Sequence, residues 1–385
     1  MKEEWKKVKL GEIATFSNGI NFGKESYTPG VKLIGVSNFG NRLFPDYEEL
    51  EEVDEKVLRP NDYLKNGDIV FVRSNGNKEL VGRCMLIQNP PSAVTYSGFC
   101  IRSRLNNVNE NSPRFFAYYF KSKMFRKAMS NTAVGANIQN LNQGLLSNHE
   151  LMIPPLPTQQ KIASILSAYD DLIENNRRQI KLLEEAALKL YKEWFVKLNF
   201  PGHETTKIVD GVPDGWKEEN LGNMLPIVTG KKDANYGTKN GKYPFFTCSQ
   251  EPIKAPAYSF DANAILLAGN GDLNVKIYRG KFEAYQRTYV LVPNSDKHLF
   301  ICYRTVQDNL RKLIHGASGS TIKFITKGMI ENIKVLIPDS KILEKFNNYS
   351  ETTLSKMESL NKQIQLLQLA RDKLLPKLMN GEIEV

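Results

Sequence analysis

A chain of 385 residues, 41% of them hydrophobic and 10% aromatic, is long enough for two or three domains and excludes wholesale disorder. The N-terminus lacks an apolar stretch and no run approaches eighteen apolar residues. We therefore expect neither a signal peptide nor a membrane span, and a cytoplasmic location. The cysteines lie far apart without a CxxC pair, and the histidines show no ligand spacing, which predicts reduced buried thiols and no metal.

The net charge of +10 is concentrated in two stretches of the chain. Lys and Arg exceed Asp and Glu by four in residues 1–157 and by five in residues 198–338. The segments 158–197 and 339–385 carry only +1 and 0. Basic surfaces favour a polyanionic partner, although mild basicity is also common in proteins that bind none.

The first basic stretch, residues 1–153, predicts a mixed α+β domain. It opens with WKKVKLGEIATFSNG (5–19) and contains the β-type runs DIVFVRSNG (68–76) and RCMLIQNP (83–90). An amphipathic helix is expected from Ser112 to about Ser130, with Pro113 in its first turn. The loop GANIQN (135–140) and an apolar strand then lead into Ile-Pro.

A long helix is predicted within residues 154–200, with Thr158 as its N-cap and Pro201 and Gly202 as its stop. Its apolar residues alternate spacings of four and three, which is the heptad pattern of a helix that packs along one seam. The seam residues are Ile162, Leu166, Tyr169, Ile173, Ile180, Leu183 and Leu190, with the polar Asn176 among them. Asn176 is either a register-setting residue or a partly exposed one.

The same plan returns about 184 residues later. Residues 201–337 contain WKEENLGNMLPIVTG (216–230), the runs AILLAGNGD (264–272) and QRTYVLVP (286–293), and an amphipathic helix within 296–316. Residues 338–385 form a second long helix with the seam Met357, Leu360, Ile364, Leu367 and Leu374. Helices of about forty residues are about 60 Å long. We predict that the two pack antiparallel as a coiled coil; alternatively, each covers only its own domain.

The tandem plan and the segment IPPLPTQQKI…DLIENN…IKLLEE…LYKEWF (153–195) strongly resemble the specificity (S) subunit of type I restriction-modification systems, as does QRTYVL. The resemblance covers the whole chain and is most specific in the central helix. It implies an α+β fold with two target recognition domains joined by two antiparallel coiled-coil helices with internal pseudo-twofold symmetry. Each domain would read one part of a split target in double-stranded DNA, and the helices would space the domains.

The resemblance also implies partners and cofactors. Two methyltransferase (M) subunits would dock on the helices, and restriction (R) subunits are a further partner that the sequence leaves open. S-adenosylmethionine, ATP and Mg are expected only on those partner subunits, and none on this non-catalytic chain. The charged residues Asp170, Asp171, Glu174, Arg177, Arg178, Glu184 and Glu185 are either a docking face or an ordinary solvated helix face.

Candidate DNA-contacting residues lie in polar loops that follow strands, where Arg and Asn side chains can bond base edges and Lys can bond phosphates. In the first half they are Arg73, Ser74, Asn75, Asn77, Lys78, Arg83, Asn137 and Gln139. In the second half they are Lys231, Lys232, Asn270, Asp272, Asn274, Lys276, Arg287, Ser320, Thr321 and Lys323. The alternative for each loop is ordinary turn chemistry or capping of the preceding helix.

Three other functions are less compatible with the sequence. QNPPS (88–92) and LAGNGD (267–272) are similar to motifs of a permuted amino-methyltransferase, but Ser92 replaces the stacking aromatic and Gly271 precedes a strand-like run. A nuclease would need a cluster of carboxylates with a lysine at a suitable spacing, and the sequence contains no convincing one. Isolated acids such as Asp68 and Asp272 are more typical of turns. A coiled-coil assembly protein without DNA binding accounts for the helices but leaves the charge distribution unexplained.

Overall fold

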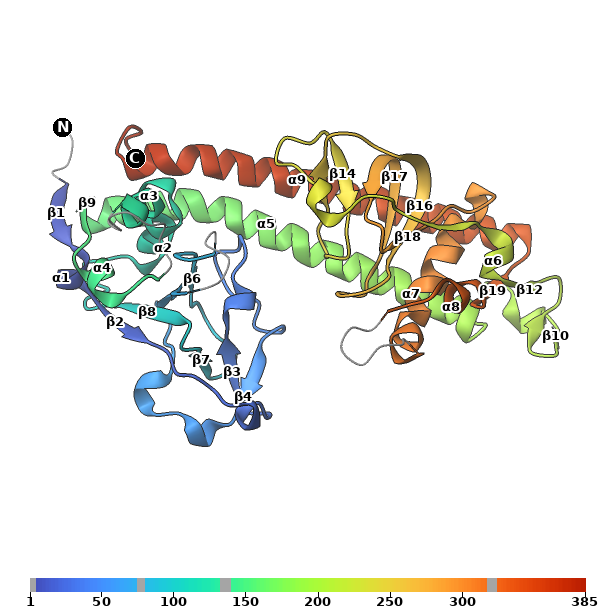
Figure 1. Ribbon diagram of the computed structural model, residues 1–385, viewed down its shortest axis with the longest axis horizontal. Coiled ribbons are helices and arrows are strands. Elements are labelled where there is room, and N and C mark those ends of the chain that lie inside the picture. The colour runs from blue at the N-terminus through green and yellow to red at the C-terminus, as the bar shows by residue number, and fades with distance from the viewer. Residues whose placement is uncertain (1–4, 75–79, 132–139, 317–323) are drawn as a thin grey trace. The chain divides into compact units, whose positions relative to one another are not determined.

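The computed structural model describes residues 5–74, 80–131, 140–316 and 324–385 (Figure 1). It divides into two compact units, unit 1 with residues 1–177 and 361–385 and unit 2 with residues 178–360. Each unit therefore contains one α+β domain together with part of both long helices. Within the described residues, none of the helices is both long and apolar enough to cross a membrane.

The domain of unit 1 contains two small sheets and a strand pair. Its elements are β1 (Lys6–Lys9), α1 (Leu10–Ile13), β2 (Ala14–Asn18), β3 (Val31–Ile34), β4 (Glu51–Val53), β5 (Ile69–Val72), β6 (Cys84–Leu86), β7 (Val94–Tyr96), β8 (Cys100–Leu105), α2 (Pro113–Lys121), α3 (Lys123–Asn131), α4 (Gln143–Ser147) and β9 (Glu150–Ile153). The strand orders are β2-β8-β5-β6, β4-β3-β7 and β1-β9. All these pairs are antiparallel except β3 with β7.

The domain of unit 2 repeats this plan and adds one short strand pair at its start. Its elements are β10 (Ile208–Val209), β11 (Val212–Pro213), β12 (Lys217–Asn220), α6 (Leu221–Met224), β13 (Ile227–Thr229), β14 (Tyr243–Phe246), β15 (Ile253–Ala255), β16 (Phe260–Ala268), β17 (Val275–Ala284), β18 (Thr288–Leu291), α7 (Leu299–Gly316), α8 (Lys327–Glu331) and β19 (Lys334–Ile337). The strand order β13-β18-β16-β17-β14-β15 matches that of unit 1, and β12 pairs with β19 as β1 does with β9.

One strand differs between the two domains for a visible reason. The single strand β17 corresponds to both β6 and β7. It pairs antiparallel with β16, as β6 does with β5, and parallel with β14, as β7 does with β3. In unit 1 the strand is interrupted by Pro90 and Pro91, which lack the backbone N–H that a ladder needs. The internal repeat predicted from the sequence is thus confirmed, with this break as its main departure.

The amphipathic segment after Ser112 forms two helices where the sequence predicted one. The predicted start is confirmed: Pro113 is the first residue of α2, and the Ser112 hydroxyl caps the helix by accepting a bond from the Phe115 N–H at 3.4 Å. The helix stops at Ser122, whose backbone is extended and whose own hydroxyl accepts a bond from the Phe125 N–H at 3.2 Å. Ser122 therefore starts α3 instead of continuing α2.

The long helices are α5 (Leu156–Tyr191), followed by a π-helical turn over Lys192–Val196, and α9 (Ser340–Met379). Helix α5 begins before Thr158, so the predicted N-cap was wrong: Pro157 fits the first turn, where a missing N–H costs nothing. Asp339 caps α9, accepting bonds from the N–H groups of Lys341 at 2.9 Å and Ile342 at 3.0 Å.

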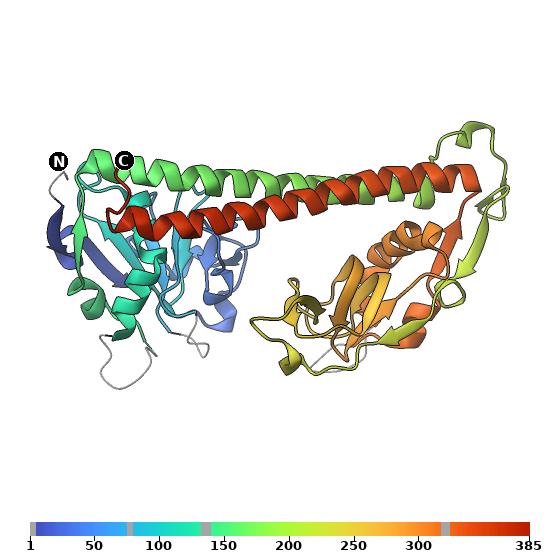
Figure 2. The same cartoon turned by 90° about the horizontal axis from the view of Figure 1, so that it is seen from above.

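Within each unit the two helices lie side by side, with residue numbers that run in opposite directions (Figure 2). In unit 1 Asn176 of α5 donates a bond to Gln363 of α9, and in unit 2 the rings of Phe195 and Phe346 meet at 4.8 Å. Every predicted seam residue is buried or half-buried. Asn176 is buried, so of its two readings the structure favours the register-setting one.

Each domain packs on the helices through its own amphipathic helix. In unit 1 the aromatic side chains of α2 share a core with Ile162 and Leu166 of α5 and Leu378 of α9. In unit 2 the apolar side chains of α7 share a core with Tyr191 and Phe346. The seam predicted from periodicity is therefore wide enough to hold a domain as well as the partner helix.

The four cysteines are free thiols, and burial sets their reactivity. Burial raises the pKa of Cys84 to about 11 and those of Cys100 and Cys302 to about 12. Cys248 is half-buried, so one of the four predicted buried thiols is partly accessible.

A thiol reagent at pH 7.5 is expected to modify Cys248 alone in the native protein and all four cysteines after unfolding, because only thiolates react. Mass spectrometry of labelled peptides measures this. The raised pKa values of Cys84, Cys100 and Cys302 also predict a pH dependence. The contribution of these buried thiols to the free energy of unfolding is fully present below about pH 8.5, the pKa of an unfolded thiol, and is lost as the pH rises through their pKa values in the folded protein. Early labelling of Cys84 would contradict the packing described for unit 1.

Candidate nucleic-acid interface

Three chain segments meet at the end of the sheet in each unit, and backbone hydrogen bonds hold them together. We call this the strand-end corner: residues 73–74, 97–100 and 140–141 in unit 1, and residues 269–270, 285–288 and 324–325 in unit 2. In unit 1 the N–H of Arg73 donates to the carbonyl of Phe99 at 2.8 Å, and the N–H of Leu141 donates to the carbonyl of Arg73 at 2.8 Å.

Unit 2 has the same bonds at equivalent positions. The N–H of Gly269 donates to the carbonyl of Arg287 at 2.8 Å, and the N–H of Ile325 donates to the carbonyl of Gly269 at 2.9 Å. The bridge between Ser74 and Asn140 likewise recurs as a bridge between Asn270 and Phe324. The strand-end corner is therefore formed by the same backbone contacts in both units.

A glycine sits against this corner in both units. A Cβ on Gly19 would lie 2.3 Å from the carbonyl oxygen of Ser97, and a Cβ on Gly230 would lie 2.5 Å from that of Tyr285. These are the closing glycines of the two repeated opening segments. Backbone approach this close leaves no room for a side chain, which explains why glycine occurs at both places.

Several predicted residues occupy the strand-end corners. Arg73 and Ser74 lie at the first, and Asn270 and the exposed Arg287 lie at the second. Lys232 pairs by its backbone with Tyr285 at the second corner, and its ammonium lies 4.5 Å from the centre of the Tyr236 ring. Lys231 beside it is exposed. These side chains put guanidinium, amide, hydroxyl and ammonium donors at the same end of each sheet.

Other predicted residues are held by the fold. Asn274 is buried, and its amide donates to the carbonyls of Cys248 at 3.0 Å and Asp272 at 2.6 Å. Lys276 donates to the carbonyl of Ser249 at 2.9 Å, and burial, its main influence, lowers its pKa. Both side chains tie the 248–249 turn to the start of β17, a role that sequence could not distinguish from base contact.

Arg83 lies in a different setting from Arg73. It lines a cavity of about 350 Å³ together with Lys121 of α2 and Arg371 of α9. The Lys121 ammonium donates to the carbonyl of Arg42 at 2.7 Å, and burial is the largest influence lowering its pKa. The prediction grouped Arg83 with Arg73 because both flank the same loop. The backbone of Arg83 pairs with Val72, and successive side chains along a strand point to opposite faces, so Arg83 and Arg73 are directed to different sides.

The remaining predicted contacts, Asn75, Asn77, Lys78, Asn137, Gln139, Ser320, Thr321 and Lys323, lie outside the described residues. They stay predictions. Phe99 and Phe324 also lie on the strand-end corners and are exposed, and the sequence-based prediction, which rested on polar side chains, did not include them. Both belong to the segments that form the strand-end corners, and these segments can be identified only when the structures of the two units are compared.

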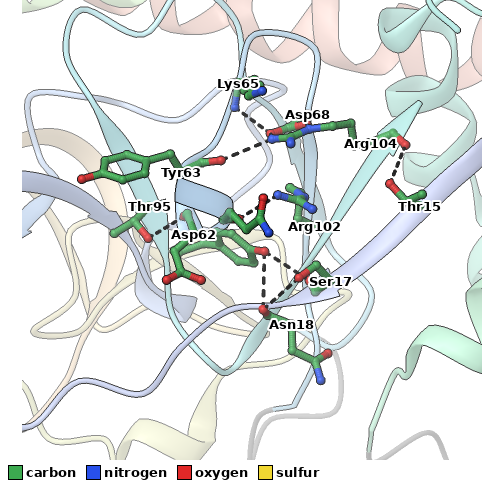
Figure 3. A network of polar contacts seen from close by, with 12 residues as sticks. Thr15, Ser17, Asn18, Asp62, Tyr63, Lys65, Asp68, Thr95, Arg102 and Arg104 are labelled. Carbon is green, nitrogen blue, oxygen red and sulfur yellow. Dashed lines mark hydrogen bonds and ion pairs between the residues drawn. The ribbon is translucent and has the colours of Figure 1, made fainter. Parts of the chain in front are cut away.

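A buried ion pair supports the sheet of unit 1 (Figure 3). The Arg104 guanidinium donates to both carboxylate oxygens of Asp68, at 2.7 and 2.6 Å, and the Lys65 N–H donates to the same carboxylate at 2.6 Å. Nearby, Arg102 donates to the carbonyl of Asn61 at 3.0 Å. Asp68 is thus a structural acid that fixes the chain before β5, in line with the sequence-based preference for a turn role.

The acidic residue Asp170 does not belong to a solvated face, contrary to its grouping with the outward charges. Its carboxylate accepts a bond from the Tyr118 hydroxyl at 2.6 Å and forms an ion pair with Arg371. Only 6% of the Asp170 side chain and 11% of the Arg371 side chain are exposed. Residues Asp171, Arg178 and Glu185 of the same group are exposed as predicted.

The methyltransferase-like motifs lack their required surroundings. Gly271 has a positive φ of 67° and is followed by strand β17 (Val275–Ala284), whereas a cofactor-binding glycine turn of this kind is followed by a helix. Within the described part of the chain, no group of three or more His, Cys, Asp or Glu side chains is placed to hold a metal ion.

Two units with one plan, sharing a pair of long helices and each ending in a polar strand-end corner, define a tandem recognition protein. The sequence model of the type I restriction modification DNA specificity domain matches residues 2–185 and 213–366, so the chain belongs to that family. Its members are the non-catalytic DNA-recognition subunits of type I restriction-modification systems, which bind DNA and assemble with other subunits.

Individual relatives agree with this assignment. The chain is 39% identical to the EcoDI specificity subunit of Escherichia coli over 45% of its own length and 39% of that protein. It is 26% identical to the putative MjaX specificity subunit of Methanocaldococcus jannaschii over 100% of this chain and 94% of that one. Among solved structures, the S subunit from M. genitalium matches 98% of this chain and 96% of that one, with a TM-score of 0.53 and 17% identity, which supports the shared fold.

Proposed function

We propose that each unit reads one part of a split target in double-stranded DNA through its strand-end corner. The observation that carries the proposal is the recurrence of this corner, with the same backbone bonds and with Arg and amide side chains, in two domains that hold nearly all the net positive charge. Arg73 and Ser74 would contact bases from unit 1, and Asn270 and Arg287 from unit 2. Arg pairs with guanine and Asn with adenine by two bonds each.

Phosphate contacts would come from the lysines beside these corners, chiefly Lys231 and Lys232 in unit 2. Such contacts position a protein on the duplex and make binding sensitive to salt, but they carry no sequence information. Asn75, Asn77, Lys78, Asn137, Gln139, Ser320, Thr321 and Lys323, in the loops that adjoin the corners, remain further candidates. Asp272 is exposed and has the acceptor that a cytosine amino group would need.

The long helices would set the gap between the two parts of the target. Helix α5 has 36 residues and α9 has 40, and both pass from one unit into the other. A helix of this length covers about 54–60 Å at 1.5 Å per residue, which exceeds one turn of DNA at about 34 Å. A stiff connection also turns the second contact into an intramolecular event at high effective concentration.

Methyltransferase subunits would dock on the helices, and unit 1 offers an apolar surface for one of them. The side chains of Leu172, Leu366 and Leu369 are 52%, 57% and 53% exposed. Leu172 and Leu366, with Ala370, line a shallow groove of about 420 Å³ between α5 and α9. Large leucines this exposed on a helical pair fit an amphipathic helix of the partner.

Leu366→Asp is expected to weaken assembly with the methyltransferase by about 2–4 kcal/mol, roughly 30- to 1,000-fold, because it puts a charge into an apolar contact. Co-purification and analytical ultracentrifugation measure the loss. Gln365→Asp, on the neighbouring exposed position of α9, is the matched control and should leave assembly intact. Equal assembly of both variants would place the docking surface elsewhere.

Methyl transfer, ATP use and cleavage would belong to partner subunits, with S-adenosylmethionine, ATP and Mg bound there. Two methyltransferase subunits would suit a chain with two similar units, and restriction subunits would join the same complex. The alternative function is a coiled-coil assembly protein without DNA binding. It accounts for the helices and leaves the repeated corners without a role.

Methylation mapping tests the proposal. The chain is co-expressed with the methyltransferase encoded beside it in a host that lacks both, and the modified genome is sequenced. A motif of two short defined parts around a fixed number of unread bases is the expected result. An uninterrupted motif would mean that one unit alone reads DNA. No modification, together with no binding to duplex DNA at low salt, would favour the assembly protein.

A further inference from the structure

Each strand-end corner carries an exposed phenylalanine. The side chain of Phe99 is 57% exposed and that of Phe324 is 42% exposed. Single exposed apolar residues are common on protein surfaces and by themselves mean little. These two lie at the equivalent corner of both repeats, and each corner also contains an arginine, Arg73 in unit 1 and Arg287 in unit 2.

The backbone bonds show that the two corners exchange the segments that carry these side chains. The carbonyl that accepts from Arg73 belongs to Phe99 in unit 1, and the carbonyl that accepts from Gly269 belongs to Arg287 in unit 2. Phe324 occupies the bridge position held by Asn140 in unit 1. Each corner therefore has one arginine and one phenylalanine, although the segments that supply them differ. The recurrence of the pair in both units, supplied by different segments, points to a shared use.

The rigid setting limits what these phenylalanines can do. The carbonyl of Phe99 accepts a bond from the Arg73 N–H, and Phe324 is bridged to Asn270, so the backbone that carries each ring is fixed at its corner. An arginine that reads guanine does so from the major groove. A phenylalanine presented with it meets base edges in the same groove, where the apolar feature is the thymine methyl group.

We infer that Phe99 and Phe324 are specificity-determining residues, each of which contacts the methyl group of one thymine in the part of the target that its unit reads. This inference rests on the proposed reading of a split DNA target. It adds an apolar contact in each unit to the polar base contacts, and it assigns one base pair in each part to a single side chain.

The test compares Phe99→Ala and Phe324→Ala with the unaltered chain by methylation mapping. Phe99→Ala is expected to relax one position in one part of the motif and leave the other part unchanged, and Phe324→Ala to do the reverse. The unchanged part shows in the same experiment that the variant is folded and assembled. Val108→Ala and Val209→Ala, exposed apolar residues away from the corners at 58% and 60%, are matched controls that should change neither part.

Purified complexes then bind duplexes in which uracil replaces thymine at the relaxed position. The unaltered complex should lose about fourfold in affinity, the value of one buried methyl group, and the matching alanine variant should lose nothing further. Relaxation without a uracil effect would overturn the methyl contact. Variants that keep the full motif would overturn the inference while leaving the proposed function intact. Absence of a split motif with the unaltered chain would overturn both.

Discussion

Arg371→Ala is expected to destabilise unit 1 by about 3–5 kcal/mol, the cost of leaving a buried carboxylate without its partner. The Asp170 carboxylate is almost fully buried and would keep only the bond from the Tyr118 hydroxyl. Burial and the Asp170 charge raise the pKa of Tyr118, so its hydroxyl stays protonated and keeps donating this bond, but it supplies no positive charge. Thermal and urea unfolding of the purified chain measure the change.

Two variants make this result specific. Lys334→Ala removes an exposed pair with Glu218, whose side chains are 59% and 49% exposed, and should cost less than about 1 kcal/mol. The triple change Tyr118→Phe, Asp170→Leu and Arg371→Ala should recover most of the loss, because an apolar replacement leaves no unpaired charge. Its design follows the chain itself: shifted by 184 residues, Asp170 corresponds to Leu354 and Arg371 to Ala187. A loss from Arg371→Ala no larger than the Lys334→Ala control would contradict the argument.

Insertion of one heptad into each long helix is expected to lengthen the unread gap of the target by about three base pairs. Seven residues add about 10.5 Å at 1.5 Å per residue, and B-DNA rises about 3.4 Å per base pair. Insertion between residues 177 and 178 and between 360 and 361 falls where α5 and α9 leave one unit and enter the other, so the contacts within each unit are kept. Seven residues also keep the phase of the seam.

Methylation mapping of the insertion variant provides the measurement. Both defined parts of the motif should be unchanged while the gap grows. A heptad inserted into α5 alone is the control, since it shifts the two seams against each other and should lower the unfolding midpoint without producing a single longer gap. If the gap were unchanged with both insertions, the proposal that the helices set the spacing of the target would be wrong.

Much of the scaffold followed from local sequence patterns. The spacing of Ile162, Leu166 and Ile173 identified the buried side of α5, and Ser112 followed by Pro113 indicated the start of α2. The repeated opening segments with their closing glycines predicted two copies of one domain. These features depend on residues within a few turns of each other, and the period of a helix or strand makes them visible in one dimension.

The candidate interface was predicted less completely, because it depends on segments that are distant in sequence. Arg73 and Arg287 were correctly placed at strand ends, but nothing in the sequence separated Arg73 from Arg83 or showed that Asn274 is buried. The phenylalanines could not be recognised from composition, since an apolar residue in a loop usually belongs to a core. Only the backbone bonds between three separate segments reveal that Phe99 and Phe324 are exposed at equivalent corners.

The sequence by itself thus determined the family, the tandem plan, the two long helices and their seams, since periodicity, capping and repetition are properties of neighbouring residues. The tertiary structure decided which charges are buried and which side chains meet. Asp170 was indistinguishable from its exposed neighbours until Arg371 and Tyr118 were packed against it. Burial depends on what covers a residue, and the covering groups come from segments up to about 200 positions away.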